Sequence, residues 1–282
     1  MKVMRRKVSA ERPLSVVVLG NSLTVLSIPG RTGDDDGLYV EVLRDLLIAA
    51  GVPTSVHLEG RWFDFATKAL GRYEQSVRSH LPDVVVLQFG LNESQPWLLP
   101  VPVVGHFVSQ HEVTTRSGAW YRAHVAPTAW RYVRRYRRWA APQVGLRTWQ
   151  TTPHRFESAM HQLIRAIRYD SRALVLVLDV HPPGDLLEHF LPGMAPRHAV
   201  IQEQLRSAVA GFHDDEVRLV EVSLLLGDAD VDGMADQMHY SPRGHRLVAE
   251  RLAEEVLDWL SGRLAPQEEG VEPTRRGHRE GP

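Results

Sequence analysis

The stretch "VVVLGNSLT" (residues 16–24) joins a short apolar run to a glycine and a small hydroxyl residue. Four consecutive apolar residues that end at Gly20 are typical of a buried strand in a parallel sheet. Ser22 follows the break, where a serine can either serve a turn through local hydrogen bonds or act as a nucleophile. The residues that follow the other strands decide between these two interpretations.

Five apolar runs with helical patterns between them indicate an α/β fold. The strand-like runs lie near residues 15–20, 54–60, 83–90, 173–180 and 217–223. The helical patterns cover about 38–50, 63–79, 153–169, 197–211 and 241–261. In the last of these helices, Ser241 is the expected N-cap and Pro242 the first helical residue. This alternation predicts a doubly wound parallel sheet.

The domain organisation follows from where the periodic patterns begin and end. We predict one α/β domain over residues 14–262, interrupted by an Arg/Trp-rich helical insertion at about 94–152. A basic N-terminal arm (1–13) precedes the domain. The polar, charged segment 263–282 follows it, and we expect that tail to be disordered.

Composition excludes several classes of chemistry. The chain of 282 residues contains no cysteine, which excludes disulfides, a thiol nucleophile and a cysteine-ligated metal. The formal net charge is −1, so the overall charge indicates no particular partner. The basic N-terminus is not followed by the apolar region of a signal peptide, and no stretch approaches the length of a membrane span. The sequence therefore predicts a cytoplasmic protein.

Neither a metal nor a cofactor is expected. The run "DADVDG" (residues 228–233) resembles the start of a calcium loop, but its twelfth position needs a bidentate glutamate and is His239. The acidic run at 33–37 is typical of a solvated turn before a helix. No dinucleotide fingerprint, phosphate-binding loop or zinc-protease helix occurs.

Polar residues and glycines stand at the ends of all five predicted strands, where ligands bind in such sheets. They are Ser22, Gly60, Asn92, His181 and, after a loop, the pair Asp236 and His239. Alone, each has a purely local explanation, such as a turn, a cap or a surface histidine. Their occurrence together at corresponding strand ends favours a functional site.

Acyl transfer by serine needs a base, a group that orients the base, and donors for the oxyanion. Ser22 is the candidate serine, His239 the base and Asp236 the orienting group, since a spacing of three residues lets Asp236 reach the far ring nitrogen of His239. The Asn92 amide and the backbone N–H groups of Ser22 and Gly60 form the expected oxyanion hole. His181, after the fourth strand, is a further candidate for substrate contact.

These residues resemble the blocks of the SGNH or GDSL hydrolases. "GNSLT" is similar to the nucleophile block, Gly60 to the glycine block (with Gly71 as a rival), "GLNE" to the G-x-N-D block and "DQMH" to the D-x-x-H block. The resemblance covers about residues 14–261, except the insertion. It implies a three-layer α/β/α sandwich with a five-stranded flavodoxin-like parallel sheet. It also implies metal-free serine chemistry on a small acyl ester or thioester.

Two residues depart from the family pattern. Asn21 stands in place of the usual aspartate beside the nucleophile, and Glu93 replaces the aspartate after Asn92. Neither belongs to the predicted triad, so a serine esterase remains the leading hypothesis. The departures are the support for a different class of function, a catalytically inactive binding protein on the same fold.

The insertion raises the question of a partner. Nine arginines occur between Glu112 and Glu157 with no Asp, Glu or Lys. One interpretation is a helical lid whose aromatic side chains pack down while the arginines are solvated. The other is a docking surface for an anionic group, such as coenzyme A or acyl carrier protein, with Arg134 and Arg137 as candidate contacts. Nucleic acid is not expected, because the rest of the chain is not basic, and a membrane surface is a weaker alternative.

A docking surface of this kind would suit acyl transfer from a thioester to a sugar hydroxyl. The position and composition of the insertion are similar to those of actinobacterial sugar octanoyltransferases, which belong to the same superfamily. Acyltransferase activity through the same acyl-serine is therefore the alternative to ester hydrolysis. The sequence does not identify the acyl chain, the acceptor or the oligomeric state.

Overall fold

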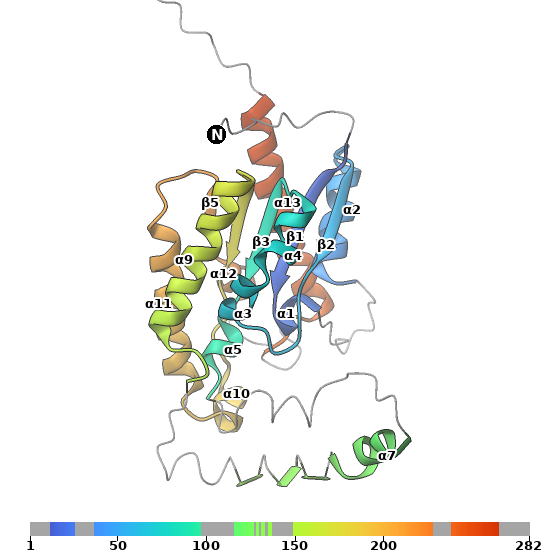
Figure 1. The fold of residues 1–282 in the computed structure, drawn as a ribbon, viewed down its shortest axis with the longest axis vertical. Helices are drawn as coiled ribbons and strands as arrows, with labels where there is room; N and C mark the ends of the chain where they lie inside the picture. Colours follow the sequence, from blue (N-terminus) through green and yellow to red (C-terminus); the bar gives the residue numbers. More distant parts are fainter. Residues whose placement is uncertain are drawn as a thin grey trace, which may run out of the picture.

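Five parallel strands form the centre of the computed structural model (Figure 1). They are β1 (Leu14–Gly20), β2 (Thr54–Leu58), β3 (Val84–Gln88), β4 (Leu174–Leu178) and β5 (Val217–Val220). Their order across the sheet is β2-β1-β3-β4-β5, and every neighbouring pair is parallel. This is the flavodoxin-like order, so the predicted fold class is confirmed.

The structure describes residues 12–25, 37–96, 116–126, 128–129, 131–132, 135–136, 149–227 and 238–264. Most of the predicted N-terminal arm and tail lies outside these ranges, and both remain predictions. Among the described helices, none has the length and apolar character needed to cross a membrane.

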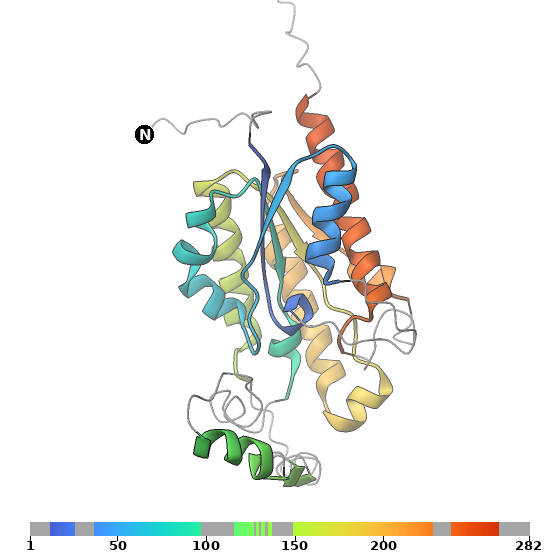
Figure 2. The ribbon, with the colours of Figure 1, turned by 90° about the vertical axis from the view of Figure 1, so that its right-hand side faces the viewer.

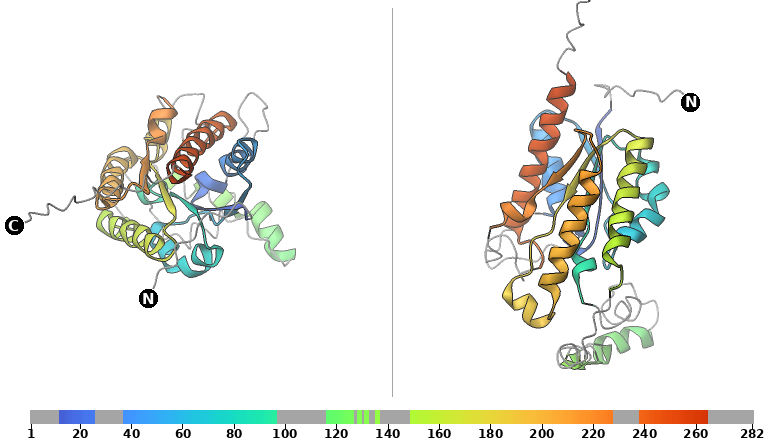
Figure 3. Two further views of the ribbon diagram at one scale, coloured as in Figure 1. Left: turned by 90° about the horizontal axis from the view of Figure 1, so that it is seen from above. Right: turned by 90° about the vertical axis from the view of Figure 1, so that its left-hand side faces the viewer.

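Helices cover both faces of the sheet, which gives the three layers seen in Figures 2 and 3. On one face lie α2 (Tyr39–Ala49) and α13 (Pro242–Leu264), and on the other lie α3 (Ala66–Gly71), α4 (Tyr73–Ser76), α9 (Pro153–Asp170) and α11 (Met194–Ala210). Successive side chains of a strand point to opposite faces. In β1, Val16 and Val18 pack with the first layer, whereas Val17 and Leu19 pack with the second. All four are fully buried, which explains the continuous apolar run.

Short helices follow the carboxyl ends of four of the strands. They are α1 (Ser22–Val25), α5 (Leu91–Ser94), α10 (Asp185–Phe190) and α12 (Val222–Leu225). Figure 1 shows α1, α5 and α10 gathered at one end of the sheet. The carboxyl edge is therefore the place where polar residues from several strands meet.

The prediction of a single helix over residues 63–79 is wrong. This segment is divided into α3, α4 and a 3-10 turn, η1 (Arg78–His80). The break falls after Gly71, where Arg72 has φ −113° and ψ 14°. Leaving the helix lets the Arg72 guanidinium form an ion pair with Asp64, and both side chains are largely buried. A tertiary contact thus overrides the local helical pattern.

The predicted insertion contains α7 (Arg116–His124). The core helix that follows β3 is delayed to α9, where Pro153 is the first residue and Thr152 accepts a hydrogen bond from the Arg155 N–H at 3.4 Å. Figure 1 shows α7 off the carboxyl end of the sheet. Tyr132 and Tyr136 are exposed, whereas the lid hypothesis expected the aromatic side chains of the insertion to pack down.

Candidate active site

Ser22 and His239 are 217 residues apart in the chain and are in direct contact. The distance from Ser22 Oγ to His239 Nε2 is 3.0 Å. Ser22 opens α1 immediately beyond β1, and His239 lies just before α13. Both are buried, with 7% and 9% of their surface exposed. A neutral imidazole whose Nε2 accepts the serine hydroxyl proton is the arrangement that general-base activation of a nucleophile requires.

Asn21 holds the turn that presents Ser22. Its Oδ1 accepts a hydrogen bond from the Leu23 N–H at 3.1 Å, and its carbonyl accepts one from the Thr24 hydroxyl at 2.7 Å. The side chain is fully buried. An aspartate would supply the same acceptor but would bury a negative charge. The replacement at position 21 therefore keeps the cap of α1 and leaves the Ser22–His239 contact intact.

Two glycines make room for Thr24. A Cβ atom on Gly20 would lie 2.2 Å from Thr24 Cγ2, and one on Gly60 would lie 2.1 Å from Thr24 Oγ1 and 2.8 Å from a Val25 methyl carbon. These separations are far below any van der Waals contact. The segment after β2 continues along β1, since the Arg61 N–H donates to the Gly20 carbonyl at 3.0 Å. Gly60 therefore lies directly against the helix that carries Ser22, whereas the rival Gly71 has open space around it.

Asn92 lies in the first turn of α5, directly after β3, the neighbour of β1. Its Nδ2 donates to the Asp64 carbonyl at 2.8 Å, and the side chain is buried. Asp64 is itself fixed by Arg72, whose Nη1 donates to its carboxylate at 3.0 Å. Arg72 also donates to the Glu59 carbonyl at 3.2 Å. The loop around Gly60 is thus tied to α5 and α3 before any ligand binds.

Glu93 connects the same two segments through its carboxylate. One oxygen accepts the Ala66 N–H and the other accepts the Gly90 N–H, each at 2.9 Å. Burial raises the pKa of Glu93 to about 7, with the nearby Asp64 carboxylate adding to the rise and the backbone donors opposing it. The glutamate that departs from the family pattern therefore links α5 to the start of α3. Its charge changes near neutral pH.

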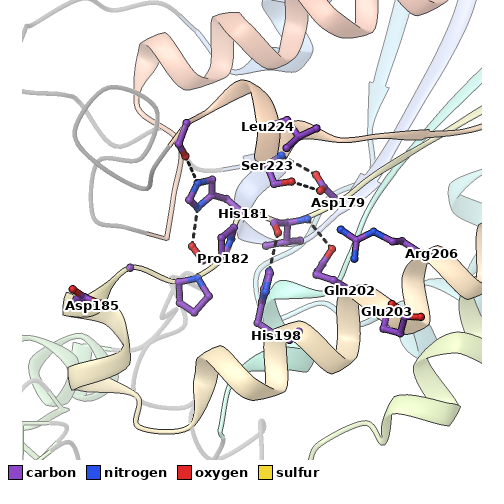
Figure 4. A pocket seen from close by; sticks show the side chains of 15 residues that line it. Asp179, His181, Pro182, Asp185, His198, Gln202, Glu203, Arg206, Ser223 and Leu224 are labelled. Carbon is purple, nitrogen blue, oxygen red and sulfur yellow. Dashed lines mark hydrogen bonds between the residues drawn. The ribbon is translucent and has the colours of Figure 1, made fainter.

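His181 lies at one side of a cleft of about 1220 Å³ beyond β4 and β5 (Figure 4). Its Nδ1 lies 2.7 Å from the Pro182 carbonyl oxygen and its Nε2 lies 2.6 Å from that of Gly227. Both ring nitrogens therefore face backbone carbonyls, and substrate would have to displace one of them. Gly227 precedes the segment that leads to His239, so His181 anchors the beginning of that segment. Substrate binding by His181 stays a prediction.

Four other polar residues of the cleft, His198, Gln202, Asp179 and Ser223, also contact backbone or one another. Figure 4 shows His198 and Gln202 reaching up from α11, and Asp179 facing Ser223. His198 Nε2 donates to the Val180 carbonyl at 2.7 Å, and burial lowers its pKa to about 4, so the ring is neutral at pH 7. The Asp179 carboxylate accepts from the Ser223 N–H at 2.9 Å and from its hydroxyl. These contacts stabilise the carboxyl ends of β4 and β5.

Three predicted site residues, Asp236, Arg134 and Arg137, lie outside the described residues. Their roles remain predictions. Within the part of the chain that the structure describes, no three His, Asp or Glu residues gather in an arrangement suited to a metal ion.

Several structural residues of the site were not predicted from the sequence. Gln88 and Tyr240, the residue after His239, form a buried hydrogen bond, and Asp64 pairs with Arg72. The available signals were weak: Gln88 is the one polar residue in the run "VVVLQF", and Tyr240 directly follows His239. Neither signal indicates a partner that is far away in the sequence.

Comparison with solved structures places this architecture among lipases and esterases. A protein described as a GDSL-like lipase, from Parabacteroides merdae, is 13% identical with a TM-score of 0.55, covering 89% of this chain and 98% of that one. A lipase/acylhydrolase from Enterococcus faecalis is 16% identical with a TM-score of 0.54, covering 90% and 99%. The esterase EstA from Pseudoalteromonas is 12% identical with a TM-score of 0.52, covering 88% and 98%.

At this level of identity the likeness concerns the fold, which resembles that of the GDSL hydrolases as the sequence blocks predicted. No protein-family model and no curated protein sequence matches the chain.

We predict that Gly60→Ala destabilises the protein by about 1–3 kcal/mol, because the new methyl group overlaps Thr24. Urea unfolding measures the change. Gly71→Ala is the matched control and should leave stability within about 1 kcal/mol of the parent or raise it, since open space surrounds that position. A double-mutant cycle with Thr24→Ala should show that the two changes are strongly non-additive. Equal effects of the two glycine variants would contradict the close approach.

We also predict that Glu93 makes stability fall as pH rises. With a folded pKa of about 7 and an ordinary value of 4.5, the folded protein binds more protons than the unfolded chain between these pH values. The contribution of Glu93 is therefore fully present below about pH 4.5 and is lost as pH rises through about 7. Its slope reaches at most about 1.4 kcal/mol per pH unit.

Glu93→Gln removes that slope because the amide does not titrate. Urea unfolding of both proteins between pH 4.5 and 8 measures the difference in slope. Glu157→Gln is the control and should follow the parent, because this α9 glutamate is only partly buried and accepts a hydrogen bond from the Ser207 hydroxyl at 2.6 Å. If parent and Glu93→Gln have parallel pH profiles, Glu93 does not titrate in this range.

Proposed function

We propose that this protein is a serine-dependent ester hydrolase with an acyl-serine intermediate, acting on a small acylated molecule. The observation that carries the proposal is the 3.0 Å contact between Ser22 Oγ and His239 Nε2 at the carboxyl edge of a GDSL-like fold. The lipases and esterases that share the fold support the same class of reaction.

In the first half of the proposed reaction, Ser22 Oγ attacks the acyl carbonyl carbon while its proton moves to His239 Nε2. The carbonyl oxygen becomes an oxyanion, for which the Ser22 and Gly60 N–H groups and the Asn92 amide are the proposed donors. His239 then gives its proton to the leaving alcohol as the carbon–oxygen bond breaks. Asp236 is the proposed partner of the second ring nitrogen of His239 and would stabilise the imidazolium.

In the second half, a water molecule takes the place of the alcohol. His239 accepts a proton from this water as its oxygen attacks the acyl carbon, and then returns a proton to Ser22 as the acid leaves. The bonds that fix α1, α5 and the loop around Gly60 hold the proposed donors before substrate arrives. Such preorganisation is the main source of catalytic power in oxyanion holes.

We predict that a fluorophosphonate probe labels Ser22 and that Ser22→Ala and His239→Ala each lower kcat by at least about 10³-fold on short-chain nitrophenyl esters. Mass spectrometry of the labelled peptide and steady-state kinetics provide the two measurements. Ser76→Ala, at another buried serine, is the matched control and should label and turn over like the parent. A folded parent protein that neither labels nor hydrolyses any ester would support an inactive binding protein instead.

The same protein can be tested for acyl transfer, the alternative activity through the same acyl-serine. An acyl-CoA is supplied with and without a sugar acceptor, and free CoA is measured. A hydrolase consumes the thioester at the same rate in both reactions, whereas an acyltransferase consumes it faster when the acceptor is present. Replacing Arg134 and Arg137 with glutamine should raise the KM for acyl-CoA if the insertion binds the anionic donor.

A further inference from the structure

A buried glutamine ends the central strand of the sheet. Gln88 is the last residue of β3, whose four preceding residues are all Val or Leu. Val84 and Val86 pack with the layer formed by α2 and α13, and alternation along the strand turns Gln88 toward the same layer. Gln88 has no exposed surface. A polar side chain in such a place needs a partner to offset its lost hydration.

The partner of Gln88 is Tyr240, the residue immediately after His239. Gln88 Nε2 donates to the Tyr240 hydroxyl at 2.5 Å. Tyr240 is fully buried, and its ring meets the rings of Tyr39 and His245 edge-on, with centroids 6.4 and 5.3 Å away. The backbone at position 240 is therefore fixed both by ring packing and by a directed hydrogen bond.

The Gln88–Tyr240 bond also connects the segment that carries His239 to the segment that carries Ser22. Gln88 stands directly beside Gly20 in the parallel register of β1 and β3, and Gly20 is two residues before Ser22. Tyr240 is one residue from His239. The Gln88–Tyr240 bond thus joins the strand beside the nucleophile to the residue beside the base.

We propose that the Gln88–Tyr240 hydrogen bond is a positioning contact that holds His239 Nε2 against Ser22 Oγ. The proposal rests on the function proposed above, and it assigns no direct contact with substrate to either residue. A shift of the base by about 1 Å is sufficient to lower a reaction rate about 100-fold.

A contribution to stability does not explain why residues 88 and 240 are a polar pair. Gln88 Oε1 is buried and makes no hydrogen bond among the described residues. Burying an unsatisfied acceptor destabilises the folded state, and apolar residues of similar shape at both positions would avoid that cost. The Gln88–Tyr240 pair supplies a directed bond that fixes the relative position of the two side chains, and an apolar pair would not.

The test uses the full chain, with Tyr240→Phe, Gln88→Leu and the double variant. Each should lower kcat for a short-chain nitrophenyl ester by about 10- to 100-fold, with KM unchanged, because substrate contacts remain while the base is misplaced. The rate of fluorophosphonate labelling at Ser22 should fall by a similar factor. Thermal unfolding of each variant is measured in parallel.

The double variant separates positioning from stability. Removing both polar groups should return the melting temperature close to that of the parent, since no buried group is left without its partner. Its kcat should nevertheless stay low. If kcat recovers together with the melting temperature, the pair is structural only and the proposal is overturned. If either single variant fails to fold, the kcat and melting temperature of the double variant still test the positioning role.

Tyr39→Phe is the matched control, because its hydroxyl is equally buried on the same layer but makes no hydrogen bond among the described residues. It should leave kcat and the labelling rate unchanged. A comparable loss of kcat in Tyr39→Phe would show that any change in this layer disturbs the site, which would overturn the proposal. An inactive, unlabelled parent would overturn the proposed function, whereas an active parent with fully active Gln88 and Tyr240 variants overturns only the positioning role.

Discussion

The parallel pairing of β1 between β2 and β3 is the constraint on which the candidate site depends. It brings three strand ends to one edge, so that Ser22, Gly60 and Asn92 begin neighbouring turns. The turn at Ser22 fits only because Gly20 and Gly60 leave space for Thr24. The Ser22–His239 contact can form across 217 residues because α13, which begins just after His239, packs on the same sheet.

Around this edge, buried polar groups are fixed mainly by backbone atoms. Asn92 and Glu93 each bond to a carbonyl or an N–H of a neighbouring segment, and Arg72 adds one such bond to its ion pair with Asp64. Such bonds hold a loop in place without depending on a second mobile side chain. The two residues that depart from the family pattern belong to this framework: Asn21 caps α1, and Glu93 links α5 to α3. Their positions explain why both replacements are compatible with an intact Ser22–His239 contact.

The features predictable from sequence are those with a local or periodic signal. Five apolar runs, three of them almost continuous, predicted the strands and the fold class, and Ser241 is a cap as predicted, since its hydroxyl accepts the Gly244 N–H at 3.1 Å. The partners of Gln88 and Arg72 were not predictable, because each contact depends on how distant segments pack. The same reason explains the helix break after Gly71. For Asp236 the D-x-x-H spacing remains the only support.

The packing of Thr24 between two glycines restricts how this protein can diversify. A methyl group added at Gly20 or Gly60 would displace Thr24, two residues after the proposed nucleophile Ser22. Under the proposed function, new substrate preferences would therefore come from segments farther from β1, such as the insertion between β3 and α9 or the cleft beyond β4 and β5. In a library designed to change selectivity, variation at positions 20 and 60 would mostly lower stability, because every added side chain overlaps Thr24. Variation in the outer segments would explore shape while the nucleophile stays in place.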